Sequence, residues 1–307
     1  MWLQAVIVGN VKFLRQSISH LFLSLVVIAA FVSASAIAQE PSTLTGDIRL
    51  HKIFHSVILN NDRVLIVFLP PGYEANNRSR YPVFYLNDGQ NLFDGATSFI
   101  RGQEWRVDET AQFLINARRI EPLIIVGIYH TGDDRINEFG PVADKNLKIG
   151  GKADLYGRML VEELKPFIDH TYRTRNSSRH TGLGGSSMGG IVSLYLGLKY
   201  PNVFGRVAVI SPSVWFADKQ IVRYVDTLPK KSDVRIWLDM GTKEGRNPEE
   251  AARGVDDARL LKDTLLRKGW KVGRDFKYVE AENAEHNERA WAARVEPILT
   301  FLFPQKM

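Results

Sequence analysis

A glycine-rich stretch at residues 182–190 constrains the fold of this chain more than any other part of its sequence. It contains the pattern G-x-S-x-G, centred on Ser187, which is typical of a sharp strand-to-helix turn that exposes a serine hydroxyl above a sheet. Such a turn is strained, and its backbone segments pass so closely that glycine is needed beside the serine. Both flanks fit, because residues 180–183 read as a short buried strand and residues 191–198 as a helix that is apolar on nearly all sides.

The same glycine pattern has two other interpretations. A plain strand–helix turn without chemistry has a similar composition. A dinucleotide-binding frame G-x-G-x-x-G starting at Gly182 fails, because Ser187 stands where the third glycine is required. With a strand before the turn and a helix after it, we interpret Ser187 as a nucleophile.

The N-terminal region reads as an export signal. Basic residues precede an apolar run at residues 21–32, and an A-x-A cleavage pattern follows at residues 36–38. A membrane anchor is the alternative. The apolar run is short for a bilayer span, which argues against an anchor. The long basic region before it leaves an uncleaved anchor open. We therefore expect residues 1–38 to be a signal peptide and residues 39–307 a single domain. That domain would be periplasmic or secreted, without a stable membrane anchor after cleavage.

Composition narrows the function classes. The chain has 307 residues, no cysteine and a net charge of +6, and removal of Lys12 and Arg15 with the signal leaves +6 − 2 = +4. The charges are interspersed, which gives no support to nucleic-acid binding. Lack of cysteine excludes a disulfide scaffold and metal–thiolate sites. Because the chain also lacks metal-ligand spacing and a Walker loop, we expect no metal and no cofactor.

Strand and helix patterns alternate after residue 80, which predicts an α/β fold with a mostly parallel sheet and helices on both faces. Two earlier β-rich runs predict an antiparallel hairpin at the N-terminal edge. The predicted strands are 49–59, 63–69, 83–86, 123–128, 180–183, 207–210, 234–240 and 276–279. The predicted helices are 107–115, 153–168, 191–198, 248–268 and 291–302, the last interrupted at Pro297.

Ser187 needs a base and an acid. Of seven histidines, His286 follows the last predicted strand and precedes the last helix, where an α/β-hydrolase places its base. The acid should follow strand 234–240, so Glu244 and Asp239 compete. We favour Glu244, which lies on the loop, because Asp239 is still inside an apolar strand and reads as a buried structural group.

Further residues are expected around the serine at the carboxyl ends of the strands, where ligands bind in open α/β sheets. The backbone N–H groups of Met188 and Gln90 are candidate oxyanion donors. Arg135 and Trp215 are candidate substrate contacts. Core packing is an equal alternative for Trp215.

Several motifs together resemble an esterase family that includes enterochelin-type siderophore esterases, feruloyl and acetyl-xylan esterases, and mycolyltransferases. The motifs are Leu69-Pro70-Pro71-Gly72-Tyr73, Leu86-x-Asp88-Gly89-Gln90-Asn91-Leu92-Phe93-Asp94, Trp105-x-Val107-Asp108-Glu109, Gly185-Ser186-Ser187-Met188-Gly189-Gly190, Ser211-Pro212-Ser213-x-Trp215, Gly241-Thr242-Lys243-Glu244 and His286-Asn287-Glu288-x-x-Trp291. The resemblance spans about residues 49–303. It implies an α/β-hydrolase fold, Ser187 as nucleophile, His286 as base, Glu244 as acid, and an oxyanion hole at Gln90 and Met188. Some siderophore esterases of this family use a Ser–His dyad, which leaves the acid open.

One segment departs from the family. Where many relatives read R-x-x-E-Y-T-P, this chain has Phe139-Gly140 in place of Tyr-Thr, within residues 135–141. Two hydroxyls beside the expected cleft are therefore missing, and substrate contacts do not transfer there.

These patterns predict an exported, cofactor-free serine esterase that acts through an acyl-enzyme on a small-molecule ester. Soluble small-acyl, aryl or feruloyl, sugar and siderophore esters are the expected substrates. An acyltransferase with the same residues is one alternative. A non-catalytic binding protein on a hydrolase scaffold is the other.

Overall fold

The computed structural model describes residues 41–305. The predicted signal peptide, residues 1–38, lies outside the described residues, so its assignment and the start of the domain at residue 39 stay predictions. In the described part, no helix is long and apolar enough to cross a membrane.

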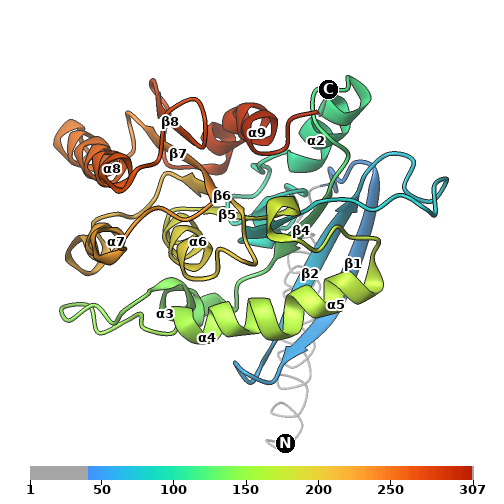
Figure 1. The fold of residues 1–307 in the computed structure, drawn as a ribbon, viewed down its shortest axis with the longest axis horizontal. Helices are drawn as coiled ribbons and strands as arrows, with labels where there is room; N and C mark the ends of the chain where they lie inside the picture. Colours follow the sequence, from blue (N-terminus) through green and yellow to red (C-terminus); the bar gives the residue numbers. More distant parts are fainter. Residues whose placement is uncertain (1–40, 306–307) are drawn as a thin grey trace, which may run out of the picture. The chain divides into compact units, whose positions relative to one another are not determined.

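Eight strands form one sheet in the order β1-β2-β4-β3-β5-β6-β7-β8 (Figure 1). They are β1 (Asp47–Ser56), β2 (Asn61–Leu69), β3 (Val83–Asn87), β4 (Ile124–Ile128), β5 (Thr181–Ser186), β6 (Arg206–Ile210), β7 (Arg235–Gly241) and β8 (Phe276–Ala281). β2 is antiparallel to both β1 and β4, and all other neighbours are parallel. The predicted mostly parallel sheet with an antiparallel N-terminal edge is confirmed.

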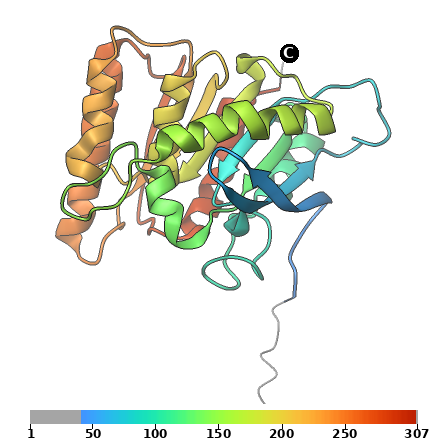
Figure 2. The ribbon, with the colours of Figure 1, turned by 90° about the horizontal axis from the view of Figure 1, so that it is seen from below.

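Helices cover both faces of this sheet. They are α2 (Val107–Asn116), α3 (Arg135–Phe139), α4 (Ala153–Arg158), α5 (Lys165–Thr171), α6 (Met188–Lys199), α7 (Phe216–Thr227), α8 (Pro248–Lys268) and α9 (Glu288–Leu302). α2 and α9 pack together on one face, and α4, α5 and α6 lie on the other (Figures 1 and 2). The predicted α/β class is confirmed.

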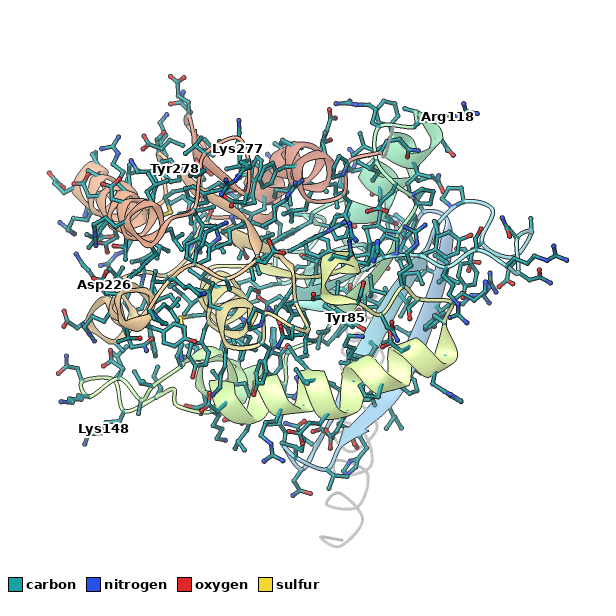
Figure 3. All side chains as sticks on the ribbon, viewed as in Figure 1. Tyr85, Arg118, Lys148, Asp226, Lys277 and Tyr278 are labelled. Atoms are coloured by element: carbon teal, nitrogen blue, oxygen red, sulfur yellow. The ribbon has the colours of Figure 1, made fainter. Side chains whose placement is uncertain are left out.

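The strands build two cores because successive side chains point to opposite faces. In β3, Val83 and Tyr85 join the apolar cluster under α4–α6, whereas Phe84 and Leu86 join the cluster under α2 and α9. Figure 3 shows Tyr85 in the interior and Lys148 at the margin. A strand buried on both faces reads as a continuous apolar run, and this run made β3 recognisable in the sequence.

Two predicted details differ in the structure, and not every helix was predicted. α9 runs through Pro297 without interruption, so the expected break there was wrong. The buried side chains of Val295, Ile298 and Leu299 hold the helix against the sheet on both sides of the proline. Residues 153–171 form α4 and α5 joined by a π-helical segment, Met159–Leu164. Helix α7 was not predicted.

The strand order has a reversal between β3 and β5. The chain passes from β3 to β4 on one side and later returns to β5 on the other side of β3. The segments that follow β3 and β5 therefore diverge at the same edge of the sheet. In open α/β sheets, ligands bind at such a switch point.

A buried carboxyl group stands in the first turn of α2. Asp108 is fully buried, and its Oδ2 accepts a hydrogen bond of 2.7 Å from the backbone N–H of Thr45. Its Oδ1 and the Oε2 of Glu109 are both buried, and neither has a hydrogen-bond partner among the described residues. Burial, with the neighbouring Glu109 carboxylate, raises the pKa of Asp108 to about 8. Asp108 is therefore protonated at neutral pH.

We predict that Asp108→Asn makes the stability of the protein less dependent on pH. The pKa of Asp108 rises from 3.8 to about 8 on folding. The stability that the protonated Asp108 gives the folded protein is therefore fully present below the pKa of 3.8 and is lost as the pH rises through the folded-state pKa of about 8. Asparagine mimics the protonated acid and cannot ionise. Urea unfolding at about pH 5 and about pH 9 should show the variant gaining stability relative to the wild type at the higher pH. The same stability difference at both pH values would contradict this assignment.

Candidate active site

The turn between β5 and α6 places Ser187 above the sheet. β5 ends at Ser186 and α6 begins at Met188, so Ser187 alone makes the connection, at φ 59° and ψ −124°. A positive φ is uncommon for a residue with a side chain and indicates strain. A Cβ atom on Gly185 would lie 3.0 Å from backbone atoms of Gly189. Glycine at this position lets the turn close around the serine.

The Ser187 hydroxyl is half-buried and points toward β6. Its Oγ lies 3.0 Å from the Oγ of Ser213, and the Ser213 N–H donates to the Ser187 carbonyl at 3.2 Å. In the described part of the chain, Ser187 Oγ makes no hydrogen bond to His286. The sequence motif contained Ser213 but suggested no role for it, because the contact depends on how β6 lies beside β5.

His286 lies in the loop between β8 and α9 and is fixed by two neighbours. Its Nδ1 is 2.7 Å from the Oε2 of Glu244, whose side chain is only 1% exposed. A carboxylate only accepts hydrogen bonds, so Nδ1 carries the hydrogen and Nε2 keeps its lone pair. Trp291 packs edge-on against the imidazole, with ring centroids 5.0 Å apart. Nε2 is thus available to accept a proton.

The two candidate acids have different surroundings. Glu244 contacts His286, whereas Asp239 is fully buried in β7 and accepts from Arg294 at 2.6 Å and from the Trp237 indole at 2.7 Å. Burial raises the pKa of Asp239 to about 6, although Arg294 and Trp237 act in the opposite direction. The structure brings Glu244, not Asp239, to the imidazole.

The expected oxyanion donors come from two segments, the start of α6 and a turn that lines the same cavity as Ser187. Met188 is the first residue of α6, and Gln90 lies in the 3₁₀ turn Gly89–Asn91 that follows β3. Backbone N–H groups in the first turn of a helix have no partner within it. A Cβ on Gly89 would lie 2.6 Å from the backbone of Gly127, so only glycine lets this turn press against β4. Both N–H groups are therefore free of intrahelical bonds beside the serine.

His286 lines two cavities, and Ser187 lines one of them. The Arg135 cavity, of about 610 Å³, includes Gln90, Asn91, Phe99, His130, Arg135, Ser187 and Trp291. The Trp215 cavity, of about 710 Å³, includes Ser213, Trp215, Lys219, Glu244, Arg246, Glu250 and Arg253. A groove of about 530 Å³ is lined by both Ser187 and Trp215. The two expected substrate contacts, Arg135 and Trp215, thus lie in different cavities.

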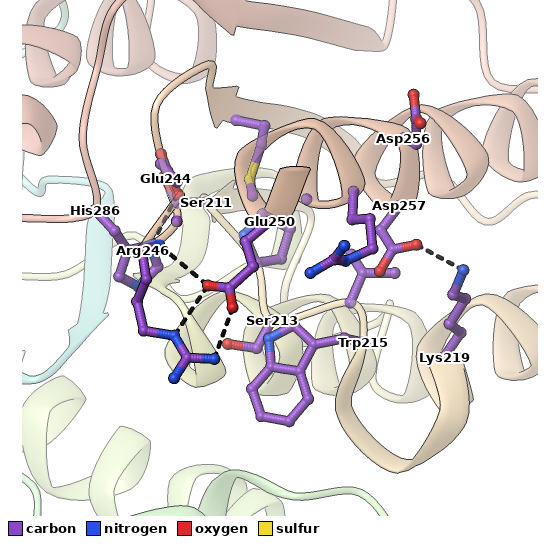
Figure 4. A pocket seen from close by; sticks show the side chains of 16 residues that line it. Ser211, Ser213, Trp215, Lys219, Glu244, Arg246, Glu250, Asp256, Asp257 and His286 are labelled. Atoms are coloured by element: carbon purple, nitrogen blue, oxygen red, sulfur yellow. Dashed lines mark hydrogen bonds and ion pairs between the residues drawn. The ribbon is translucent and has the colours of Figure 1, made fainter. Parts of the chain in front are cut away.

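Trp215 belongs to a cavity wall and not to the core. It is 58% exposed, and Figure 4 shows its indole ring beside Ser213. Two of the nearby cations are paired, since Lys219 lies 2.7 Å from Asp257 and the Arg246 guanidinium binds Glu250. The wall therefore offers a free aromatic surface.

Arg135 is held by an acidic partner. Its Nε and Nη2 bind the two oxygens of Asp88 at 2.6 and 2.7 Å, and its guanidinium stacks over Phe139. His130 lines the same cavity and accepts the Gly132 N–H on its Nδ1 at 2.9 Å. Burial lowers the pKa of His130, so the ring is neutral and its hydrogen is on Nε2. The Arg135 cavity therefore has a neutral imidazole donor and a cation already paired.

The described residues contain no candidate metal site, because no three or more of their histidine and acidic side chains gather to hold an ion. The expectation that the protein needs no metal or cofactor stays a prediction.

Comparisons with known proteins show which family the chain belongs to. The family model described as "Putative esterase" matches residues 56–302. Among curated relatives, the uncharacterized protein YbbA of Bacillus subtilis is 25% identical over 68% of this chain and 80% of its own length. Ferri-bacillibactin esterase BesA of the same organism is 28% identical over 67% of this chain and 74% of its own length. A ferulic acid esterase structure has a TM-score of 0.65 at 19% identity and covers 84% of this chain and 98% of its own, which shows the shared fold. The chain belongs to the family whose description is "Putative esterase".

Proposed function

We propose that this protein is a serine esterase with Ser187 as nucleophile, His286 as general base and Glu244 as the acid. The observation that carries the proposal is the 2.7 Å contact between His286 Nδ1 and Glu244, beside cavities that Ser187 and His286 line together. A serine on a strained turn and an imidazole oriented by a carboxylate are the parts that acyl transfer requires.

The proposed reaction has two halves. Ser187 Oγ rotates from Ser213 toward His286, attacks the ester carbonyl carbon and gives its proton to Nε2. The carbonyl oxygen becomes an oxyanion that accepts hydrogen bonds from the N–H groups of Met188 and Gln90. When the intermediate collapses, the alcohol leaves with the proton from His286 and the acyl group stays on the serine. Water then attacks the acyl-enzyme with His286 as base, and the acid is released as His286 returns that proton to Ser187 Oγ.

The cavities favour water-soluble esters that have small acyl, aryl or feruloyl, sugar or siderophore groups. Phe99 in the Arg135 cavity is 82% exposed and Trp215 in the other cavity is 58% exposed, so each offers an aromatic surface. Between β6 and β7 the chain forms only α7, whose residues 217–219 are not helical, so this segment is too short for the large helical lid of a lipase. The relative named ferri-bacillibactin esterase supports a siderophore ester as one candidate.

Hydrolysis is favoured over the two alternatives. The side chain of His286 is 40% exposed, so water can reach the base next to an acyl-enzyme. An acyltransferase would need to exclude this water in favour of a second alcohol. A non-catalytic binding protein would have no need for a buried carboxylate that fixes a histidine beside a strained serine.

We also propose that the protein is exported. The basic region, the apolar run at residues 21–32 and the A-x-A pattern at residues 36–38 support a cleaved signal. The native protein should begin at Gln39 and be recovered from the periplasm or the medium. Intact mass spectrometry measures this directly, and a native mass that retains residues 1–38 would indicate an anchor instead.

We predict that the protein hydrolyses p-nitrophenyl acetate or butyrate and has very little activity on emulsified trioleoylglycerol. Ser187→Ala should lose about 10⁴-fold or more of the activity, because no other group supplies the nucleophile. The Ser186→Ala variant is the matched control, since its hydroxyl lies one residue from the turn. It should stay active. Strong trioleoylglycerol hydrolysis with interfacial activation would contradict the open cleft, and an active Ser187→Ala would contradict the mechanism.

Glu244→Gln and Asp239→Asn should separate the two carboxylates. Glu244→Gln should lower kcat strongly with little change in KM, because the amide no longer stabilises the imidazolium that forms on His286. Asp239→Asn keeps an oxygen toward Arg294 but removes the negative charge that balances this buried cation. It should therefore mainly lower the free energy of unfolding, by about 3 kcal/mol.

The measurements are steady-state kinetics and urea unfolding of both variants. A large loss of kcat in Asp239→Asn with a mild effect of Glu244→Gln would transfer the role to Asp239. Mild kinetic effects from both would indicate a Ser–His dyad.

A further inference from the structure

Helix α9 brings two side chains behind the His286–Glu244 pair. Trp291 and Arg294 are three residues apart and therefore lie on the same side of the helix. Trp291 packs against the His286 ring, and its indole N–H donates to Ser211 Oγ at 3.0 Å. Arg294 is 5% exposed and donates to the same oxygen at 3.1 Å. Both side chains thus reach one hydroxyl group that is itself buried.

Arg294 is a single cation between two buried carboxylates. Its Nη1 lies 2.6 Å from Asp239 Oδ1, and its Nη2 lies 3.5 Å from Glu244 Oε1. Asp239 is fully buried and the Glu244 side chain nearly so, and buried like charges repel strongly without a cation between them. Arg294 therefore offsets the repulsion between the carboxyl groups of Glu244 and Asp239.

The hydroxyl of Ser211 has only one possible orientation. An indole N–H and a guanidinium N–H can only donate, so both hydrogen bonds from α9 end on the lone pairs of Ser211 Oγ. The one hydrogen of Ser211 is then directed to Glu244 Oε1, at 2.5 Å. The backbone N–H of Gly241 donates to the same oxygen at 2.7 Å. Oε1 is saturated with donors, and Oε2 alone faces His286.

We propose that Arg294 is a positioning residue for catalysis, which acts on the reaction through Ser211 and Glu244. With Asp239 as its anchor, it fixes the Glu244 carboxylate so that Oε2 holds the Nδ1–H of His286. This inference rests on the proposed Ser187–His286–Glu244 mechanism. It assigns a kinetic role to a residue that touches neither the substrate nor the imidazole.

The test compares Arg294→Met with Arg206→Met. Arg206 is a matched control because it is also nearly buried and pairs with Glu121 at 2.9 Å, but at the opposite end of the sheet, where β6 begins. Kinetics on p-nitrophenyl butyrate and thermal unfolding are measured for both. Arg294→Met should lower kcat about 100-fold at nearly constant KM, as a small misplacement of a catalytic group does. Arg206→Met should lose stability and keep kcat.

Ser211→Ala keeps the test decisive if Arg294→Met does not fold. It removes the bridging hydroxyl and leaves the Arg294–Asp239 pair in place, so kcat should fall about 10-fold with the protein folded. If Arg294→Met folds and its kcat stays within about twofold of wild type, the inference is overturned. If Arg294→Met does not fold, a kcat of Ser211→Ala within about twofold of wild type overturns it. It is also overturned if Arg206→Met loses as much kcat. A wild-type protein that is folded but inactive would instead overturn the proposed function and this inference with it.

Discussion

The strained turn at Ser187 is the constraint on which the rest of the structure depends. A residue with a side chain adopts φ 59° only if its surroundings hold it there. Here β5 is buried between β3 and β6, and α6 packs on both β5 and β6, so neither side of the turn can relax. The serine is consequently held, half-buried, at the strand-order reversal, in the cavity that the turn after β3 also lines.

The second requirement of the site is a buried carboxyl group that is held in one orientation. Glu244 meets it with donors on every side, from a backbone N–H, a serine hydroxyl and the edge of an arginine. These donors come from β7, from the residue that follows β6 and from α9, so the position of the carboxylate depends on how helix and sheet pack. This explains why Trp291 and Arg294, far from Ser187 in sequence, bear on its chemistry.

Much of the fold was predictable from local patterns. Continuous apolar runs identified the buried strands, and the glycine pattern identified the turn. Pro297 gave a wrong prediction because tertiary packing outweighs the one hydrogen bond that proline removes from α9. Glu244 could be favoured over Asp239 because a loop side chain can reach across strand ends. The Ser213 contact, the exposure of Trp215 and the pairing of Arg135 with Asp88 could not be predicted, since each joins segments distant in the sequence.

The central claim is that Ser187 carries the acyl group during turnover. Acid quenching of the wild-type protein in the first turnover of p-nitrophenyl butyrate, followed by peptide mass spectrometry, tests it most directly. The account predicts a butyryl group on the peptide that contains Ser187, located on that serine and absent after the substrate is exhausted. A butyryl group on another residue during turnover, or turnover with Ser187 unmodified at every quench time, would contradict it.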